Sequence, residues 1–137
     1  MRLVINTNII IGALIKDSLL RKIILSDIFE LYAPEYMFEE ILKHKKEILE
    51  KSGINDIVFT ALIMLIEKHI LLVPKAEYMK KLELAEKVMK KIDINDSVFI
   101  ATSLTLNCSV WSDDKHFDSQ SKVNIYKTKD IIKLIKL

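Results

Sequence analysis

Short apolar runs alternate with amphipathic segments along the chain. An unbroken apolar run predicts a buried strand, because both faces of a parallel sheet are covered. The predicted strands span residues 3–5, 29–33, 70–73, 109–111 and 123–126. Between them, apolar residues recur at helical spacing. This alternation predicts an α/β fold in which right-handed crossovers place helices on both faces of a parallel sheet.

Proline, glycine and short polar residues mark the ends of the predicted helices. Pro34 is tolerated at the first position of a helix, Gly53 suits a helix end, and Asn55 or Asp56 can cap the following helix. The predicted helices span residues 9–15, 18–27, 34–53, 56–68, 77–91, 97–106 and a last segment capped by Thr128. The helix at 97–106 is apolar nearly all round, so we expect it to be buried.

The composition narrows the class of protein. The 137 residues suit one domain spanning 1–137, and 50% hydrophobic with 29% charged residues is a globular composition. A net charge of +2 neither indicates nor excludes a nucleic-acid partner. The single cysteine, Cys108, excludes a disulfide framework and favours a cytoplasmic location. The longest apolar stretch, residues 57–66, is too short to span a bilayer, so no membrane partner is expected.

Polar residues gather where the predicted strands end, which is where open α/β sheets bind ligands. The candidates are Asn6, Thr7 and Asn8, then Ser112, Asp113 and Asp114, then Asp93, Asn95 and Asp96 before the buried helix, and Glu39 and Glu40 after the second strand. Oxygen donors without sulfur or a conspicuous histidine are the ligands that Mg²⁺ or Mn²⁺ prefers.

Four segments together resemble the PIN domain family. Residues 3–10 resemble its opening strand, which ends in Asp-Thr-Asn, and residues 34–44 resemble its helix with one acidic ligand. Residues 96–101 resemble its third motif, an Asp that opens a buried helix. Residues 111–117 resemble its fourth, a Ser or Thr and an Asp shortly before a Phe. Each motif alone is weak, but four in order are fairly specific.

The resemblance implies a three-layer α/β/α sandwich with a parallel sheet of about five strands in the order 3-2-1-4-5. It also implies RNA cleavage with Mg²⁺ or Mn²⁺ held by three or four carboxylates. The family's acidic positions fall on Asn6, Glu40, Asp96 and Asp114, and its hydroxyl falls on Ser112. Small members are commonly VapC-type toxins, active as dimers and held by an antitoxin. The implied partners are therefore RNA, a second copy of the chain and an antitoxin.

Several assignments leave alternatives open. Glu39 is an alternative to Glu40, because both lie early in a helix, where negative charge suits the dipole. Asp96 is either a helix cap or a metal ligand. If Asp96 is a ligand, Asp93 or Asn95 caps the helix. Residues expected to support or replace the ligands are Asn8, Asp93, Ser112 and Asp113. Trp111 is expected in the core, and His44 and His116 at the surface.

Asn6 departs from the family pattern, because an Asp is expected there. Asn has nearly the shape of Asp and offers one carbonyl oxygen, but it carries no negative charge. We expect reduced or abolished activity. A deliberate inactive variant, a natural enzyme with weakened chemistry and a natural non-catalytic relative all remain open. The intact remainder of the site favours a recent or deliberate loss.

The predicted function is a metal-dependent endoribonuclease, the toxin of a toxin–antitoxin pair. The alternative is a non-catalytic PIN domain that binds RNA or a protein partner. A phosphotransfer receiver fits less well, because no strand clearly supplies a phosphate-accepting Asp together with its companion Lys. A phosphatase of the haloacid dehalogenase type would need an Asp-rich first strand, where this chain has Asn6. A homodimer through residues 34–68 is expected, because half of the chain is hydrophobic.

Overall fold

The computed structural model describes residues 1–15, 18–89 and 94–136 of the chain. Its centre is a five-stranded sheet in the order β3-β2-β1-β4-β5, and every neighbouring pair of strands is parallel. The strands are β1 (Arg2–Ile5), β2 (Glu30–Pro34), β3 (Ile70–Val73), β4 (Ser109–Trp111) and β5 (Ile125–Tyr126). This order confirms the one that the family resemblance implied.

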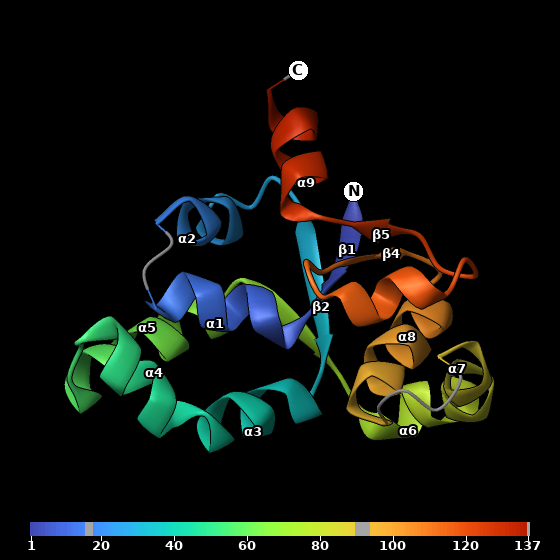
Figure 1. The fold of residues 1–137 in the computed structure, drawn as a ribbon, viewed down its shortest axis with the longest axis horizontal. Helices are drawn as coiled ribbons and strands as arrows, with labels where there is room; N and C mark the ends of the chain where they lie inside the picture. Colours follow the sequence, from blue (N-terminus) through green and yellow to red (C-terminus); the bar gives the residue numbers. More distant parts are fainter. Residues whose placement is uncertain (16–17, 90–93, 137) are drawn as a thin grey trace.

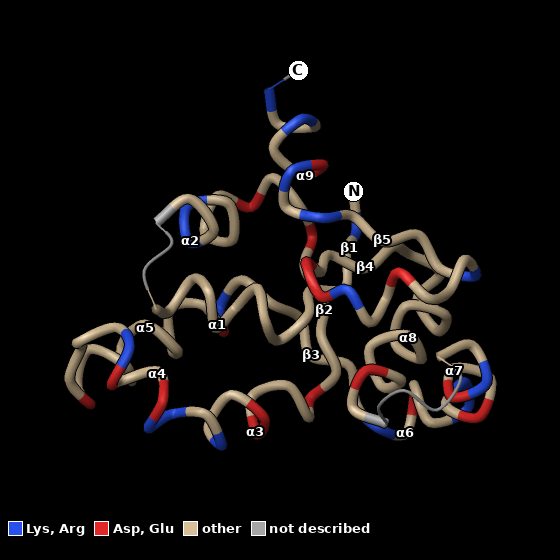
Figure 2. The backbone as a smooth tube through the Cα atoms, viewed as in Figure 1, with Lys and Arg blue, Asp and Glu red and all other residues tan. Residues whose placement is uncertain are grey.

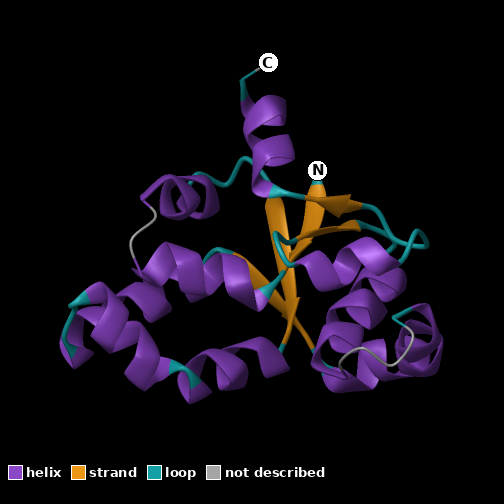
Figure 3. Cartoon of the chain, viewed as in Figure 1, coloured by secondary structure: helices purple, strands orange, loops and turns teal. Residues whose placement is uncertain are grey.

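Helices cover both faces of the sheet (Figures 1 and 3). They are α1 (Thr7–Ile15), α2 (Ser18–Leu25), α3 (Tyr36–Lys43), α4 (Lys45–Ser52), α5 (Asp56–Glu67), α6 (Lys75–Tyr78), α7 (Leu82–Val88), α8 (Ile94–Leu106), α9 (Thr128–Ile135) and the short 3₁₀ helices η1 (Met79–Lys81) and η2 (Lys115–Ser119). Figure 1 shows α1 to α5 on one side of the strands and α6 to α8 on the other. Right-handed crossovers produce this division, because the chain moves outward from β1 to β3 and then returns across the sheet to β4.

The core lies between the sheet and these two helical layers. The β1 residues Leu3, Val4 and Ile5 are fully buried, as expected for a central parallel strand. Helix α8 packs against β1, β2 and β4 on one side and against α6 and α7 on the other. Its residues Phe99 and Ile100 are buried, which confirms the prediction of a buried helix.

Three expectations about helix starts and helix continuity are wrong. Pro34 ends β2 in register with Val73, and the helix begins only at Tyr36. A proline is tolerated there because the pairing of β2 with β1 ends at Tyr32, whereas Glu35 supplies the next N–H, to the Val73 carbonyl. The single helix expected over residues 34–53 is divided at His44, whose backbone N–H bonds to the Ile41 carbonyl in a tightened turn. The helix expected over 77–91 is likewise divided into α6, η1 and α7, and residues 90–91 lie outside the described residues.

Other boundaries agree more closely with the sequence. Gly53 ends α4 with a φ of 75°, in the left-handed region that favours glycine. Asn55 caps α5 by accepting the Val58 N–H at 2.9 Å. Strand β5 is shorter than expected, because the Gln120 side chain binds the backbone of Val123 and holds it in the preceding loop. Helix α8 begins at Ile94, so Asn95 and Asp96 lie in its first turn, and Asn95 is not the residue before the helix.

Candidate functional site

The carboxyl ends of β1 and β4 lie side by side, and the residue that follows each strand is polar and buried. Ile5 pairs with Trp111, and the Asn6 N–H donates to the Trp111 carbonyl at 3.0 Å. Asn6 is 4% exposed and Ser112 is 0% exposed. The Ser112 Oγ donates to the Asn6 Oδ1 across 3.3 Å. Parallel pairing therefore joins two residues that are 106 positions apart in the chain.

A cavity of about 230 Å³ opens at this edge of the sheet, and we call it the acidic cavity. The four predicted ligand positions, Asn6, Glu40, Asp96 and Asp114, all line it. The other lining residues are Thr7, Asn8, Ile11, His44, Asn95 and His116. The start of α1, helix α3, the start of α8 and the turn after β4 thus meet around one space, in the arrangement that the motif order implied.

Asp96, Asp114 and His116 form a close group on one wall of the acidic cavity. One ligand atom from each lies within 4.8 Å of the others. The His116 Nδ1 lies 3.0 Å from the Asp96 Oδ2 and 3.6 Å from the Asp114 Oδ1. The Asp114 Oδ1 also accepts the backbone N–H of His116 at 2.9 Å and so caps η2. The imidazole therefore stands between two carboxylates that would otherwise repel each other.

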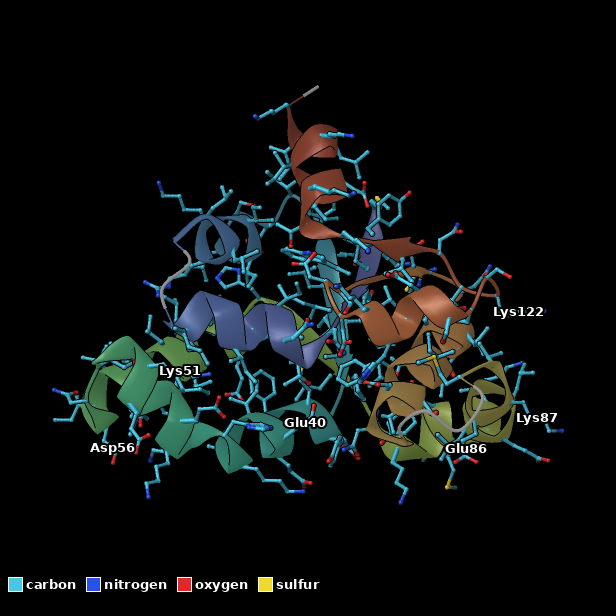
Figure 4. The ribbon with its side chains drawn as sticks, in the orientation of Figure 1. Glu40, Lys51, Asp56, Glu86, Lys87 and Lys122 are labelled. Carbon is cyan, nitrogen blue, oxygen red and sulfur yellow. The ribbon has the colours of Figure 1, made fainter. Side chains whose placement is uncertain are left out.

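Glu40, and not Glu39, faces the acidic cavity. The Thr7 Oγ1, at the start of α1, donates a hydrogen bond to the Glu40 Oε1. Figure 4 shows the labelled Glu40 side chain between α3 and α1. Glu39 is the preceding residue on α3 and lines a different, neighbouring cavity. The helix geometry thus directs the two adjacent glutamates to different places.

The side-chain oxygens of Asn6 and Asn8 fit a cation. The Asn6 Oδ1 accepts from the Ser112 Oγ and from the Asn8 N–H, so its carbonyl oxygen is held in a fixed place. The Asn8 Oδ1 is buried and has no hydrogen-bond partner among the described residues. A buried acceptor without a donor is costly unless something positive completes it. Together with the carboxylates, these amide oxygens form an oxygen-rich donor set of the kind that holds a divalent cation.

The structure does not bring Asp113 into this group. Its carboxylate accepts the Thr128 N–H at 2.7 Å and the Thr128 Oγ1 at 2.6 Å, so it anchors the start of α9. The Trp111 Nε1 also donates to the Thr128 Oγ1, at 3.1 Å. The backbone direction after β4 therefore sends the Asp113 side chain toward α9 and the Asp114 side chain toward the acidic cavity. Asp93, expected as a supporting residue, lies outside the described residues.

The sequence interpretation missed two participants. His116 was expected at the surface, and its side chain is indeed 54% exposed, yet its Nδ1 faces Asp96. The available signal was its position two residues after Asp114, inside the turn that carries the ligand. Thr7 was named only as one of the polar residues that follow the first strand. Its contact with Glu40 depends on how α1 and α3 pack, and no local pattern shows that.

The sheet is parallel, its strand order is 3-2-1-4-5, and polar and acidic residues from four segments surround one cavity at its carboxyl edge. These features define a class of α/β domains with a candidate metal-binding site. A family model described as a PIN domain matches residues 4–132. The chain belongs to the PIN domain family, whose members are generally metal-dependent nucleases. A search of curated proteins found no match. Among the described helices, none has both the length and the apolar character needed to cross a bilayer.

Proposed function

We propose that this protein is a metal-dependent endoribonuclease of the PIN type and the toxin of a toxin–antitoxin pair, with its chemistry weakened by Asn6. One observation carries the proposal: Asn6, Glu40, Asp96 and Asp114 come from four separate segments and line a single cavity. Asp96 is only 9% exposed, and a buried carboxylate close to others calls for a compensating positive charge.

The residues that would hold Mg²⁺ or Mn²⁺ are Asp96 and Asp114, with Glu40, the Asn6 Oδ1 and the His116 Nδ1 around them. Two atoms that bind one ion at about 2.1 Å each lie no more than about 4.2 Å apart. The Nδ1 distances of 3.0 Å to Asp96 and 3.6 Å to Asp114 satisfy that limit. A divalent cation supplies activation of water and stabilisation of the leaving oxygen in phosphodiester cleavage.

Neighbouring residues orient these ligands. Thr7 binds one oxygen of Glu40 and leaves the other for a ligand role. The Ser112 Oγ donates to Asn6 and accepts the Asp114 N–H at 3.0 Å, so one hydroxyl fixes two of the four positions. Ordered ligands reduce the entropy lost when a cation or substrate binds. The hydroxyl that the family pattern places on Ser112 therefore acts as a positioning group.

Lysines on α3 and α4 would meet the RNA backbone. Lys43 and Lys46 are exposed and lie on the two sides of the His44 break, and His44 itself lines the acidic cavity. Figure 2 shows basic and acidic residues interspersed along α3 and α4, so the attraction for phosphate is local and not spread over a whole face. Phosphate contacts of this kind position RNA without reading its sequence.

The presence of Asn6 supports one alternative function. In this alternative, the protein is a PIN domain that binds RNA or a protein partner without cutting RNA. The substitution removes one negative charge from the cavity and leaves the shape of the site intact. Such a protein would keep RNA binding and lose turnover. The two functions therefore differ in what happens when the charge at position 6 is restored.

The decisive experiment compares the chain with Asn6→Asp on an end-labelled RNA with Mn²⁺. We expect Asn6→Asp to cut the RNA and excess EDTA to stop it, while the chain with Asn6 cuts at least about tenfold more slowly. Asp96→Asn in the Asn6→Asp background is the matched loss of one carboxylate and should abolish cutting. RNA binding without cutting by Asn6→Asp would support the non-catalytic alternative. Cutting that persists undiminished in EDTA would contradict metal dependence.

We further propose a homodimer through the exposed apolar face of α5. Ile57 is 80% exposed, Met64 57% and Leu65 40%, and these residues lie close together at helical spacing. Leu71 and Leu72 on the edge strand β3 are also exposed. A second copy of the chain would cover the exposed face of α5, which lies within the region 34–68 expected from the sequence. The proposed toxin role includes binding by an antitoxin protein and a cytoplasmic location.

A further inference from the structure

A second and larger cavity, of about 670 Å³, adjoins the acidic cavity, and we call it the base cavity. Tyr36 and Glu39 from α3, Lys75 and Tyr78 from α6, and Asn95 and Val98 from α8 line it. Its volume lies within the range of about 300–1,000 Å³ that holds small organic ligands. Figure 1 shows the start of α3 facing α6 and the start of α8 below the sheet.

Asn95 joins the two cavities, because it lines both of them. The Tyr36 Oη donates to the Asn95 Oδ1 at 3.1 Å, so a phenol and an amide form the boundary. Asn95 is also the neighbour of Asp96 in the chain. A ligand that places one chemical group beside Asp96 and Asp114 would therefore place its neighbouring group in the base cavity.

The walls of the base cavity combine an aromatic surface with hydrogen-bonding groups. Tyr36 is half-buried, and the Lys43 Nζ lies 5.4 Å from the centroid of its ring. Tyr78 is 3% exposed, and burial, followed by the charges of Glu35 and Glu39, raises the pKa of its phenol. Its hydroxyl group therefore stays neutral. An aromatic ring beside polar groups is the surface on which single-stranded RNA bases stack.

Two acidic side chains, Glu35 and Glu39, also line the base cavity. Carboxylates repel phosphate, so acidic side chains beside an RNA chain favour contact with the N–H groups of bases. Glu35 already accepts the Lys75 N–H at 3.1 Å, whereas Glu39 has no hydrogen bond or ion pair among the described residues. An ionised carboxylate offers two acceptor oxygens and no donor. Guanine presents two adjacent donors, N1–H and the N2 amino group, while adenine and cytosine place an acceptor next to their amino group.

We propose that the base cavity holds a guanine next to the scissile phosphate, with Glu39 accepting its N1–H and N2–H and Tyr36 stacking on the ring. This inference rests on the proposed ribonuclease function. It gives the cleavage a sequence preference, and it assigns a separate role to each of two adjacent glutamates: Glu40 to the acidic cavity and Glu39 to the base cavity.

The test measures, by filter binding, the affinity of the unchanged chain for RNAs of six nucleotides in the presence of Mn²⁺. These RNAs carry G, A, C, U or inosine at one position. Inosine lacks the N2 amino group, so it removes one of the two proposed contacts. We expect guanine to bind about tenfold better than adenine or inosine, and Glu39→Gln to erase that ratio. Glu50→Gln removes the same charge from an exposed α4 residue outside both cavities and should leave the ratio unchanged.

Two further variants test the stacking surface. Tyr36→Leu should weaken binding of all the RNAs by about fivefold or more, whereas Tyr36→Phe keeps the ring and should retain most of the affinity. Cut sites mapped with Asn6→Asp should lie next to G. Cutting or binding with no preference for G, or a preference that survives Glu39→Gln, would overturn this inference and leave the ribonuclease function standing. If neither form of the protein binds RNA, the proposed function fails, and this inference fails with it.

Discussion

The Nδ1 of His116 lies 3.0 Å from the Oδ2 of Asp96, although the two residues belong to different elements. A neutral imidazole with its proton on Nε2 presents the Nδ1 lone pair to a cation beside the carboxylate. Imidazole ligands favour Mn²⁺ and the later transition metals over Mg²⁺. His116 thus offers the site of this chain a ligand that the four acidic positions of the family do not include.

We expect His116→Ala to reduce the affinity for Mn²⁺ by at least about tenfold, because a direct ligand is lost and even groups that only support ligands contribute that much, and to change Mg²⁺ affinity less. Titration calorimetry measures both ions. In the unchanged chain, electron spin echo spectroscopy of bound Mn²⁺ should show coupling to a ring nitrogen, and His116→Ala should lose it. His69→Ala removes a histidine that pairs with Asp27 instead and is the control. A nitrogen signal that survives His116→Ala would contradict the assignment.

Asn6→Asp should strengthen Mn²⁺ binding by at least an order of magnitude, because a full negative charge replaces a dipole in a buried position. Without metal, the variant should unfold at the same or a slightly lower temperature, since a further carboxylate then repels its neighbours. Circular dichroism melts with and without Mn²⁺ measure both effects. Equal affinity in the two forms would show that position 6 is not a ligand.

Asp113→Ala should lower the free energy of unfolding by about 1 kcal/mol, because the start of α9 loses the carboxylate that binds Thr128. Mn²⁺ affinity should stay within about twofold, because Asp113 does not line the acidic cavity. Asp114→Ala is the paired variant. It should lose Mn²⁺ affinity strongly, in addition to the stability that the lost η2 cap costs. Denaturant unfolding and calorimetry on both variants check this. A loss of metal binding in Asp113→Ala would place that carboxylate in the site after all.

Light scattering at micromolar concentration should give the mass of a dimer. Ile57→Lys and Met64→Lys put charges into the exposed apolar face of α5 and should give monomers that stay folded, because both side chains are more than half exposed. Leu84→Lys, on an exposed apolar residue of α7, should leave the dimer intact. A monomer at every concentration of the unchanged chain would refute the dimer.

The sequence predicted the type and order of the elements because long-range packing and local patterns agree in this fold. All of the strands except β5 lie within one residue of their predicted bounds, and the resemblance supplied the strand order. The errors arose where tertiary contacts decide the outcome. Pro34 can end a strand or start a helix, and only pairing with Val73 selects the strand. The break at His44 follows a run of good helix formers and has no local signal.

Within the site, the sequence could place residues along the chain but could not orient their side chains. Glu39 and Glu40 are identical chemically, and the roughly 100° between neighbours on a helix sends them to different cavities. The same holds for Asp113 and Asp114 after β4. The role of the four predicted residues as metal ligands stays a prediction, and their shared cavity is what supports it.

Trp111, whose indole N–H donates to Thr128, is an intrinsic fluorescent probe of the protein. Trp111 is the single tryptophan of the chain, is fully buried, and ends β4 immediately before Ser112. Its fluorescence therefore comes from one known location, between the turn that carries Asp114 and the first residue of α9. The wavelength and lifetime of its emission would report, without any label, how that part of the molecule responds when cations, RNA or a second copy of the chain are added.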